Sequence, residues 1–153
     1  MKRRKLIRTG IIVAFTGIVI AGLIGLYMFN MPHRDVQSTK TDYQLTVTSL
    51  VNEYLENAES ANEKYLASDG DSKILEVSGT VTKISEDFSG KQVIILKNKN
   101  DKAGVSCTFN EKVNVPSLGA TATAKGVINA GASYDADMEL YQDVVLSNCT
   151  LVN

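Results

Sequence analysis

The stretch that decides the fold is ILEVSGTVTKISED, residues 74–87. Apolar and polar residues alternate from Leu75 to Val81, a period of two that is typical of a β-strand with one buried face. The phase slips before Ile84, which predicts a bulge or bend within one long strand. A long and bent first strand favours a small closed barrel over a flat sheet.

Four further strands follow along the chain. They are predicted in KQVIILKN (91–98), AGVSCTFN (103–110), ATATAKGVI (120–128) and DVVLSNCTLV (143–152). The link at 111–119 contains Pro116 and is too short for a long crossover helix. Five strands in this order predict a mainly β domain over residues 69–153, a five-stranded OB-fold Greek-key barrel. A small β-sandwich is the competing fold, but it normally needs about seven strands.

An amphipathic helix is expected over residues 42–68, before the barrel. Leu50, Tyr54, Ala61 and Tyr65 recur at helical spacing, and glutamates occupy the opposite side. Asp42 or Thr46 would cap its start, and SDGDS at residues 68–72 supplies turn residues at its end. The apolar stripe of this helix is predicted to cover the core of the domain.

The N-terminal part predicts a transmembrane helix. Residues 11–29 carry no charge, and about 20 apolar residues span a bilayer core of roughly 30 Å. Residues 1–10 form a basic tail and residues 30–41 a polar tether. The alternative is a cleaved signal peptide, whose apolar region is usually shorter, about 7–15 residues.

Charge is distributed unevenly, and this predicts the orientation in the membrane. Residues 1–40 carry a net charge of +6, whereas residues 41–153 carry −7 and contain no arginine. Five basic residues precede the apolar segment, so the positive-inside rule places the N-terminus in the cytoplasm. The barrel is then expected outside the cytoplasmic membrane, on the periplasmic or cell-surface side.

Four motifs resemble those of the tRNA-anti-like family of bacterial OB-fold proteins. They are VSGTV (77–81), GVSCTF (104–109), AKG (124–126) and DVVLSNCTLV (143–152). The resemblance covers about residues 43–153, and it implies an OB fold and, by analogy of fold, nucleic-acid binding. It supplies no catalytic residues. The acidic stretch at residues 134–143 is longer than the corresponding link in the family.

The two cysteines, Cys107 and Cys149, fall on the third and fifth barrel strands, which are neighbours in an OB barrel. An oxidising compartment would favour a disulfide between them. Closing a loop of 42 positions would stabilise the domain by about 4 kcal/mol on the chain-entropy model, before strain is subtracted. The alternative is two buried, reduced thiols that pack as small hydrophobic groups.

No residue pattern points to an enzyme. The single histidine, His33, lies in the tether, so the barrel lacks a Ser/His/Asp or Cys/His arrangement. Asp135, Asp137 and Glu139 alternate, but the spacing of an EF-hand loop is absent. We therefore expect no catalytic residue, no metal and no cofactor.

The ligand surface is expected where OB folds place it, on the second and third strands, the loop between the first and second strands and the loop between the fourth and fifth strands. The residues at these positions are Lys83, Phe88, Lys97, Tyr134 and Tyr141. The alternative is that they form ordinary barrel surface. The favoured partner is a protein, a peptide or an envelope component. An oligonucleotide is the second candidate. It ranks below a protein ligand because OB domains that bind oligonucleotides present a basic groove, whereas this domain is acidic.

Overall fold

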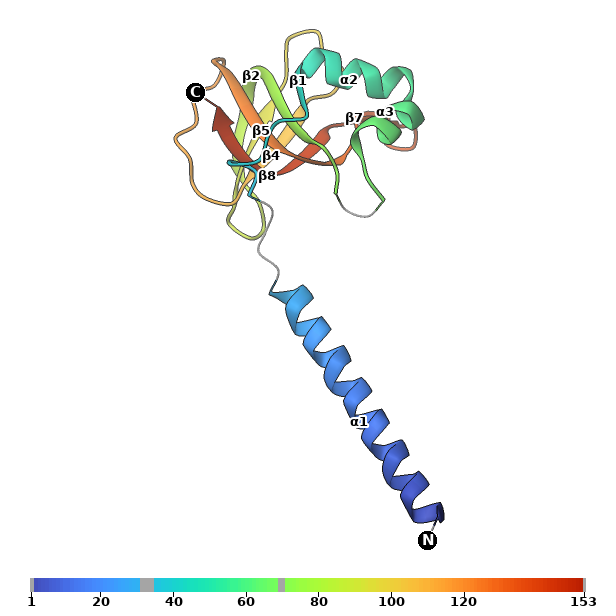
Figure 1. Cartoon of the computed structure of the whole chain (residues 1–153). Coiled ribbons are helices and arrows are strands. Elements are labelled where there is room, and N and C mark those ends of the chain that lie inside the picture. The colour runs from blue at the N-terminus through green and yellow to red at the C-terminus, as the bar shows by residue number, and fades with distance from the viewer. Residues whose placement is uncertain (1, 31–34, 69–70, 153) are drawn as a thin grey trace. The chain divides into compact units, whose positions relative to one another are not determined.

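The computed structural model describes residues 2–30, 35–68 and 71–152, with the side chains of residues 2–13 left outside the description. The chain divides into two compact units, residues 1–34 and residues 35–153. The first unit consists of the helix α1, Lys2–Phe29, so the predicted basic tail and the predicted span belong to one helix (Figure 1). Among the described residues, no helix has both the length and the apolar character that crossing a membrane requires. Ile11–Val13 of the predicted span lie outside the described side chains.

The second unit contains the predicted five-stranded barrel. Its strands are β2 (Ile74–Glu86), β3 (Gln92–Leu96), β4 (Val105–Phe109), β5 (Thr121–Ala130) and β8 (Val144–Val152). They pair in the order β2-β3-β4-β8-β5, and β5 pairs again with β2, which closes the barrel. The β4–β8 pair is parallel and the other pairs are antiparallel. This closed order confirms the mainly β, OB-type prediction.

Strand β2 is long because two neighbours share it. Its first half, residues 74–80, pairs with β5, and its second half pairs with β3. The register shifts between Val81 and Lys83, which confirms the irregularity predicted before Ile84. The bend turns β2 from one neighbour to the other, as closure of a barrel requires.

The segment before the barrel differs from the single helix predicted over residues 42–68. It comprises a short strand, β1 (Tyr43–Thr46), and two helices, α2 (Val47–Glu56) and α3 (Ala58–Tyr65). Strand β1 pairs in parallel with β2. Thr46 caps α2 as predicted, because its hydroxyl accepts a hydrogen bond from the amide of Ser49. Asn57, with φ −154° and ψ 90°, separates the helices and caps α3 through its side chain.

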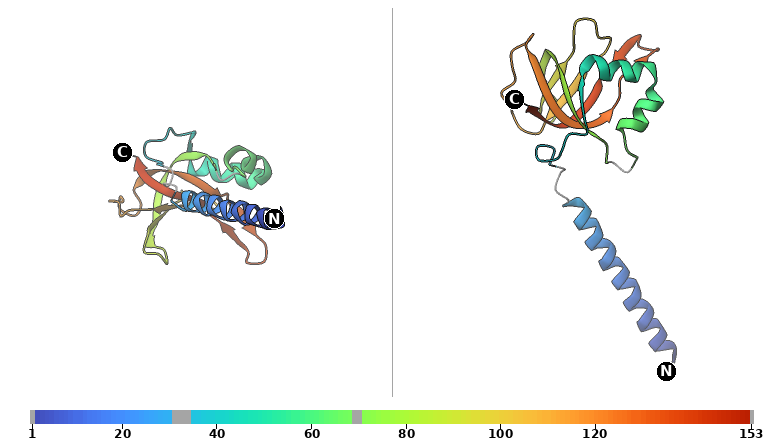
Figure 2. Two further views of the ribbon diagram at one scale, coloured as in Figure 1. Left: turned by 60° about the horizontal axis from the view of Figure 1, so that its bottom comes forward. Right: turned by 45° about the horizontal axis from the view of Figure 1, so that its top comes forward.

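The buried face of α2 packs into the core of the barrel, as predicted. Val47, Leu50, Val51 and Tyr54 are buried in one cluster with the inward side chains of the strands. Gly79 allows this close approach, since a Cβ atom there would lie 2.5 Å from a methyl group of Val47. Figure 2 shows α2 and α3 together at one side of the barrel.

A hydrogen-bonded ion pair joins the two helices. Lys64 Nζ lies 2.9 Å from the carboxylate of Glu53, which also accepts a hydrogen bond of 2.7 Å from the hydroxyl of Tyr65. Partial burial opposes ionisation of Glu53, but these two hydrogen bonds outweigh it and lower the pKa of the carboxyl. The contacts fix α3 against α2.

Residues 35–41, the second half of the predicted tether, belong to the folded domain. Val36 is buried with Ile74 and Val127. Lys125 Nζ donates to the carbonyls of Gln37 and Thr39, at 3.3 and 2.5 Å. His33, which was also assigned to the tether, lies outside the described residues.

The long link between β5 and β8, predicted as a loop, contains a hairpin. Its strands are β6 (Ser133–Asp135) and β7 (Leu140–Gln142). They form a separate two-stranded sheet, so this hairpin is an addition to the barrel.

Candidate functional site

A pair of contacting aromatic side chains lies on the β6–β7 hairpin, with large apolar side chains beside it. Tyr134 and Tyr141 are register partners, and their ring centroids lie 4.8 Å apart. Tyr134 is 52% exposed, and beside it Met138 and Leu140 are 60% and 43% exposed. These four large side chains lie within the ten residues 133–142, and three of them are exposed to a ligand while Tyr141 is half-buried.

Two lysines adjoin this hairpin from the loop between β3 and β4. Lys102 Nζ lies 5.6 Å from the centroid of the Tyr141 ring, within reach of a cation–π interaction. Lys97 Nζ donates to the carbonyl of Lys102 at 3.1 Å. We call the set Lys97, Lys102, Tyr134, Met138, Leu140 and Tyr141 the hairpin surface.

The loop that carries the lysines is held against α2 and β2. The carboxylate of Asp101 accepts hydrogen bonds from the hydroxyl of Thr48, at 2.7 Å, and from the amide of Asn98, at 2.9 Å. The side-chain oxygen of Asn98 accepts in turn from the amide of Thr80. These bonds join three elements and leave the lysines at the end of a fixed loop.

The base of the hairpin is fixed as well. The amide of Gly104 donates to the carboxylate of Asp143 at 2.6 Å, and the amide of Val144 donates to the carbonyl of Gly104 at 3.0 Å. On the other side, the ring of Tyr54 lies directly on Gly131, where a Cβ atom would be 1.9 Å from the ring. A two-stranded hairpin is marginally stable alone, so these contacts are what hold it in place.

The structure brings together three of the five predicted ligand residues, namely Lys97, Tyr134 and Tyr141. Phe88 is fully exposed in the turn between β2 and β3, at the end of β3 opposite to Lys97. Lys83 lies along β2, opposite Ile95. Phe88 and Lys83 are therefore not part of the hairpin surface.

Lys102, Met138 and Leu140 were missed by the sequence-based prediction of the site. The signal that identifies the last two is the pair of tyrosines that flank the acidic turn, since alternating side chains around a turn are typical of a hairpin. Nothing local in the sequence places Lys102 over Tyr141, because they are joined only by the fold.

The outer face of the central strands is aliphatic and hydroxylic. Val93 and Ile95 on β3 and Ser106 and Thr108 on β4 are half-buried, and Val145 on β8 is 36% exposed. No aromatic side chain of the described residues lies on this face of β3 or β4. The aromatic side chains that could stack on a ring of a ligand are therefore on the hairpin and not on β3 or β4.

The two cysteines are free thiols buried inside the barrel. Cys149 lies opposite Phe109 in the β4–β8 ladder, two residues further along β4 and three further along β8 than the pair of Cys107 and Leu146. Burial, followed by a hydrogen bond between the two thiols, raises the pKa of Cys149 well above its usual value. The neighbourhood predicted for the pair is confirmed, and the disulfide stays a prediction.

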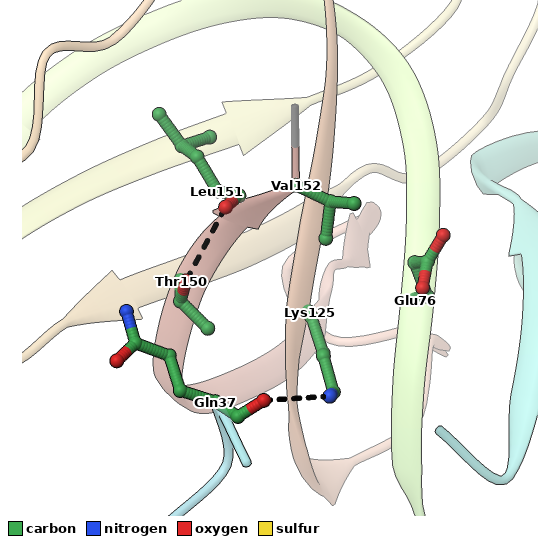
Figure 3. Close-up of a pocket in the computed structure, with 6 residues that line it drawn as sticks. All are labelled: Gln37, Glu76, Lys125, Thr150, Leu151 and Val152. Atoms are coloured by element: carbon green, nitrogen blue, oxygen red, sulfur yellow. Dashed lines mark hydrogen bonds between the residues drawn. The ribbon is translucent and has the colours of Figure 1, made fainter. Parts of the chain in front are cut away.

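A shallow hollow lies elsewhere, on the outer side of β2, β5 and β8 (Figure 3). It is lined by Gln37, Glu76, Lys125, Thr150, Leu151 and Val152. Lys125 is engaged with two backbone carbonyls, and Glu76 accepts hydrogen bonds from Thr41 and Gln44, each at 3.3 Å. Both charges already have protein partners and, unlike the hairpin surface, the hollow has no aromatic residue in its lining, so we regard it as the weaker site.

Within the described part of the chain, no group of three histidine, cysteine or carboxylate side chains is placed to hold a metal ion. In the acidic turn, the carboxylate of Asp135 accepts hydrogen bonds from the amides of Asp137 and Met138, both at 3.0 Å. That carboxylate orders the turn of the hairpin.

Comparison with known proteins gives a family and one distant structure. A model of the tRNA_anti-like protein family matches residues 1–145. No curated protein matches the chain. A chain in the crystal structure of yeast Stn1 and Ten1 is similar at 14% sequence identity and a TM-score of 0.40. The match covers 78% of this chain and 66% of that chain, slightly under two thirds of its length.

Proposed function

We propose that this chain, which belongs to the tRNA_anti-like family, is a non-enzymatic binding module that takes a polypeptide ligand on its hairpin surface. The observation that carries this proposal is the exposed ring of Tyr134 against the half-buried ring of Tyr141, with the exposed Met138 and Leu140 beside them. Tyrosine and methionine are enriched in protein interfaces, where their large side chains bury apolar area. The contacts of the hairpin with Tyr54 on α2 and with Gly104 at the end of the β3–β4 loop hold these side chains in place.

Charge favours a basic or neutral peptide over a nucleic acid. Residues 41–153 carry a net charge of −7 without any arginine, and acidic residues lie in the turn of the hairpin. Nucleic-acid affinity depends largely on several phosphate contacts made by basic side chains. The hairpin surface offers two lysines, and Lys102 is already placed over a ring.

An oligonucleotide remains the second candidate because of one observation. The exposed ring of Tyr134, the half-buried ring of Tyr141 and the nearby lysines Lys97 and Lys102 have the composition of a stacking platform, on which bases stack with little regard to sequence. The name of the family, tRNA_anti-like, also points to a nucleic acid. Such a ligand would be single-stranded and short, and its binding would weaken steeply with salt.

The experiment is a binding measurement on the full chain. Peptides selected from a random display library and a labelled oligothymidylate would be titrated by fluorescence anisotropy at low and moderate salt. The double variant Tyr134→Ala/Tyr141→Ala should weaken peptide binding at least about tenfold, the loss expected from removing interface aromatics. Phe88→Ala is the matched control, because it removes an exposed aromatic side chain outside the hairpin surface.

Peptide binding that depends on the tyrosines and not on Phe88 supports the proposal. Binding of the oligonucleotide alone, lost on raising the salt concentration, would support the second candidate. A selected peptide whose affinity is unchanged in the tyrosine variant would refute the hairpin surface as its site.

We also propose that residues 11–29 anchor the module in the cytoplasmic membrane with the barrel outside. The described side chains cover only residues 14–29 of this segment, which is shorter than a full span. Residues 11–29 carry no charge, and the basic residues precede them. The test adds protease to intact spheroplasts that carry a C-terminal tag on the chain, with a cytoplasmic protein as the control. The tag should be degraded while the cytoplasmic protein stays intact. A tag that is degraded only after lysis would overturn the orientation, and extraction of the chain by alkaline carbonate would overturn the anchor.

A further inference from the structure

Cys149 faces the interior of the barrel only because β8 is irregular. Val144 and Leu146 are buried, so strict alternation would turn residue 148 inward and residue 149 outward. Instead, the register slips against both neighbours of β8 in this region, and Asn148 adopts a positive φ of 52°. This extra residue turns Cys149 inward, and re-aiming a side chain is a known effect of β-bulges.

The bulge has a conformational cost that a regular strand would avoid. Residues other than glycine seldom adopt positive φ, although asparagine tolerates it better than most. The side-chain oxygen of Asn148 accepts a hydrogen bond of 2.9 Å from the side chain of Asn110, which supports this conformation. The hydrogen bond between Asn110 and Asn148 therefore maintains the bulge that turns the side chain of Cys149 inward.

The barrel also makes room for the sulfur atom of Cys149. A Cβ atom on Gly126 of the neighbouring strand would lie 2.6 Å from that sulfur, so only glycine fits there. On the other side lies Cys107, whose side chain is fully buried. The bulge, the glycine and the inward Cys107 together place the only two sulfhydryl groups of the chain side by side.

We propose that Cys107 and Cys149 form a disulfide inside the barrel when the chain folds under oxidising conditions. The two thiols lose two protons and two electrons as the sulfur–sulfur bond forms. A small disulfide such as oxidised glutathione accepts the electrons, and its own sulfur–sulfur bond breaks to give two thiols. This inference concerns the barrel alone and holds whatever ligand the hairpin surface takes.

The ladder predicts how the bond forms. Cys107 and Cys149 are diagonal and not directly opposite in the β4–β8 pair. Diagonal neighbours are typically about 7–8 Å apart, whereas disulfides usually span about 4.4–6.8 Å between Cα atoms. The strands must therefore shift slightly, which is easier during folding than in the closed barrel.

The test is oxidative refolding of the full chain. The protein would be unfolded in urea with reductant, refolded in detergent with oxidised and reduced glutathione, denatured and treated with iodoacetamide. Mass spectrometry should find a monomer without carbamidomethyl groups, which gains two after reduction. Native oxidised protein should resist dithiothreitol, because both sulfur atoms are buried, and should lose the bond once urea is added.

A matched variant separates the bond from general folding. Cys149→Ser leaves one thiol, so Cys107 should then be modified after denaturation without any reductant. The oxidised wild type should unfold at a higher urea concentration than its own reduced form, whereas Cys149→Ser should show no such difference between the two buffers. Two carbamidomethyl groups on the unreduced wild type, a disulfide-linked dimer or a glutathione adduct would each overturn the proposal.

Discussion

The contact between Gly131 and the ring of Tyr54 provides the sharpest test of the packing. Replacing Gly131 by alanine places a methyl group 1.9–2.5 Å from three ring atoms of Tyr54. Ordinary carbon contacts lie near 3.5–4.0 Å. The ring is buried, with 2% exposure, and α2 holds it from behind. Neither partner therefore has free space into which it can move.

Two opposing effects set the size of the change. Gly131 is not among the glycines with positive φ, so alanine is compatible with its backbone. Without the steric overlap, replacing glycine by alanine would stabilise the folded state by about 0.4–1 kcal/mol, because it lowers the conformational entropy of the unfolded chain. Overpacking of a core usually costs about 1–3 kcal/mol, and an overlap of this size belongs at the upper end. We expect Gly131→Ala to reduce the free energy of unfolding by roughly 2 kcal/mol.

The assay is urea unfolding of the full chain in detergent, followed by the fluorescence of its tyrosines and by circular dichroism. A second variant, Gly131→Ala/Tyr54→Leu, tests the cause, because a smaller aliphatic side chain makes room for the methyl group. The two substitutions should couple by at least about 0.5 kcal/mol in the favourable direction. A single variant as stable as the wild type, or a cycle without coupling, would refute the contact.

Three further predictions concern neighbouring groups. Glu53→Gln should destabilise by less than about 1 kcal/mol, since the pair with Lys64 is partly exposed. Hydrogen bonds from Lys64 and Tyr65 outweigh partial burial and lower the pKa of Glu53. The free energy of unfolding should therefore fall as the pH drops through the pKa of Glu53 in the folded state. Glu53→Gln should lack this acid-dependent loss in urea titrations. Tyr54→Phe should be neutral or stabilising by up to about 1 kcal/mol in thermal unfolding, because the buried hydroxyl has no hydrogen-bond partner among the residues that the structure describes and burial raises its pKa to about 12. Lys125→Met should free the segment before β1, which limited proteolysis would detect as faster cleavage there while the barrel stays intact.

The barrel strands are predictable from the sequence because their side chains alternate. The order of strands, the long β2 and its irregularity near Ile84 all follow from a period of two and its interruption. The bulge in β8 escapes this reasoning. The motif around Asn148 reads as a continuous strand, and only the pairing with β4 and β5 shows that one residue is extra.

The segment before the barrel shows where local patterns fail. Helical spacing continues from Leu50 to Tyr65, so the sequence predicts a single helix. The helices separate at Asn57 because its side chain caps α3. Asparagine side chains make similar backbone hydrogen bonds in turns, so the residue type alone does not predict a second helix. Residues 43–46 become a strand because β2 offers them a partner, and that partner is known only from the fold. Tertiary pairing decides both features.

The hairpin surface depends on α2 as well as on the barrel strands, and this dependence links stability with binding. Thr48 holds the loop that carries the lysines, and Tyr54 lies on the residue from which the hairpin departs. The two contacts are six residues apart on one helix, at its start and near its end. A shift of α2 therefore moves the lysines and the tyrosines together. Gly131→Ala should for this reason weaken a ligand of the hairpin surface under conditions where the chain is still folded, while a ligand bound along β3 and β4 should be unaffected.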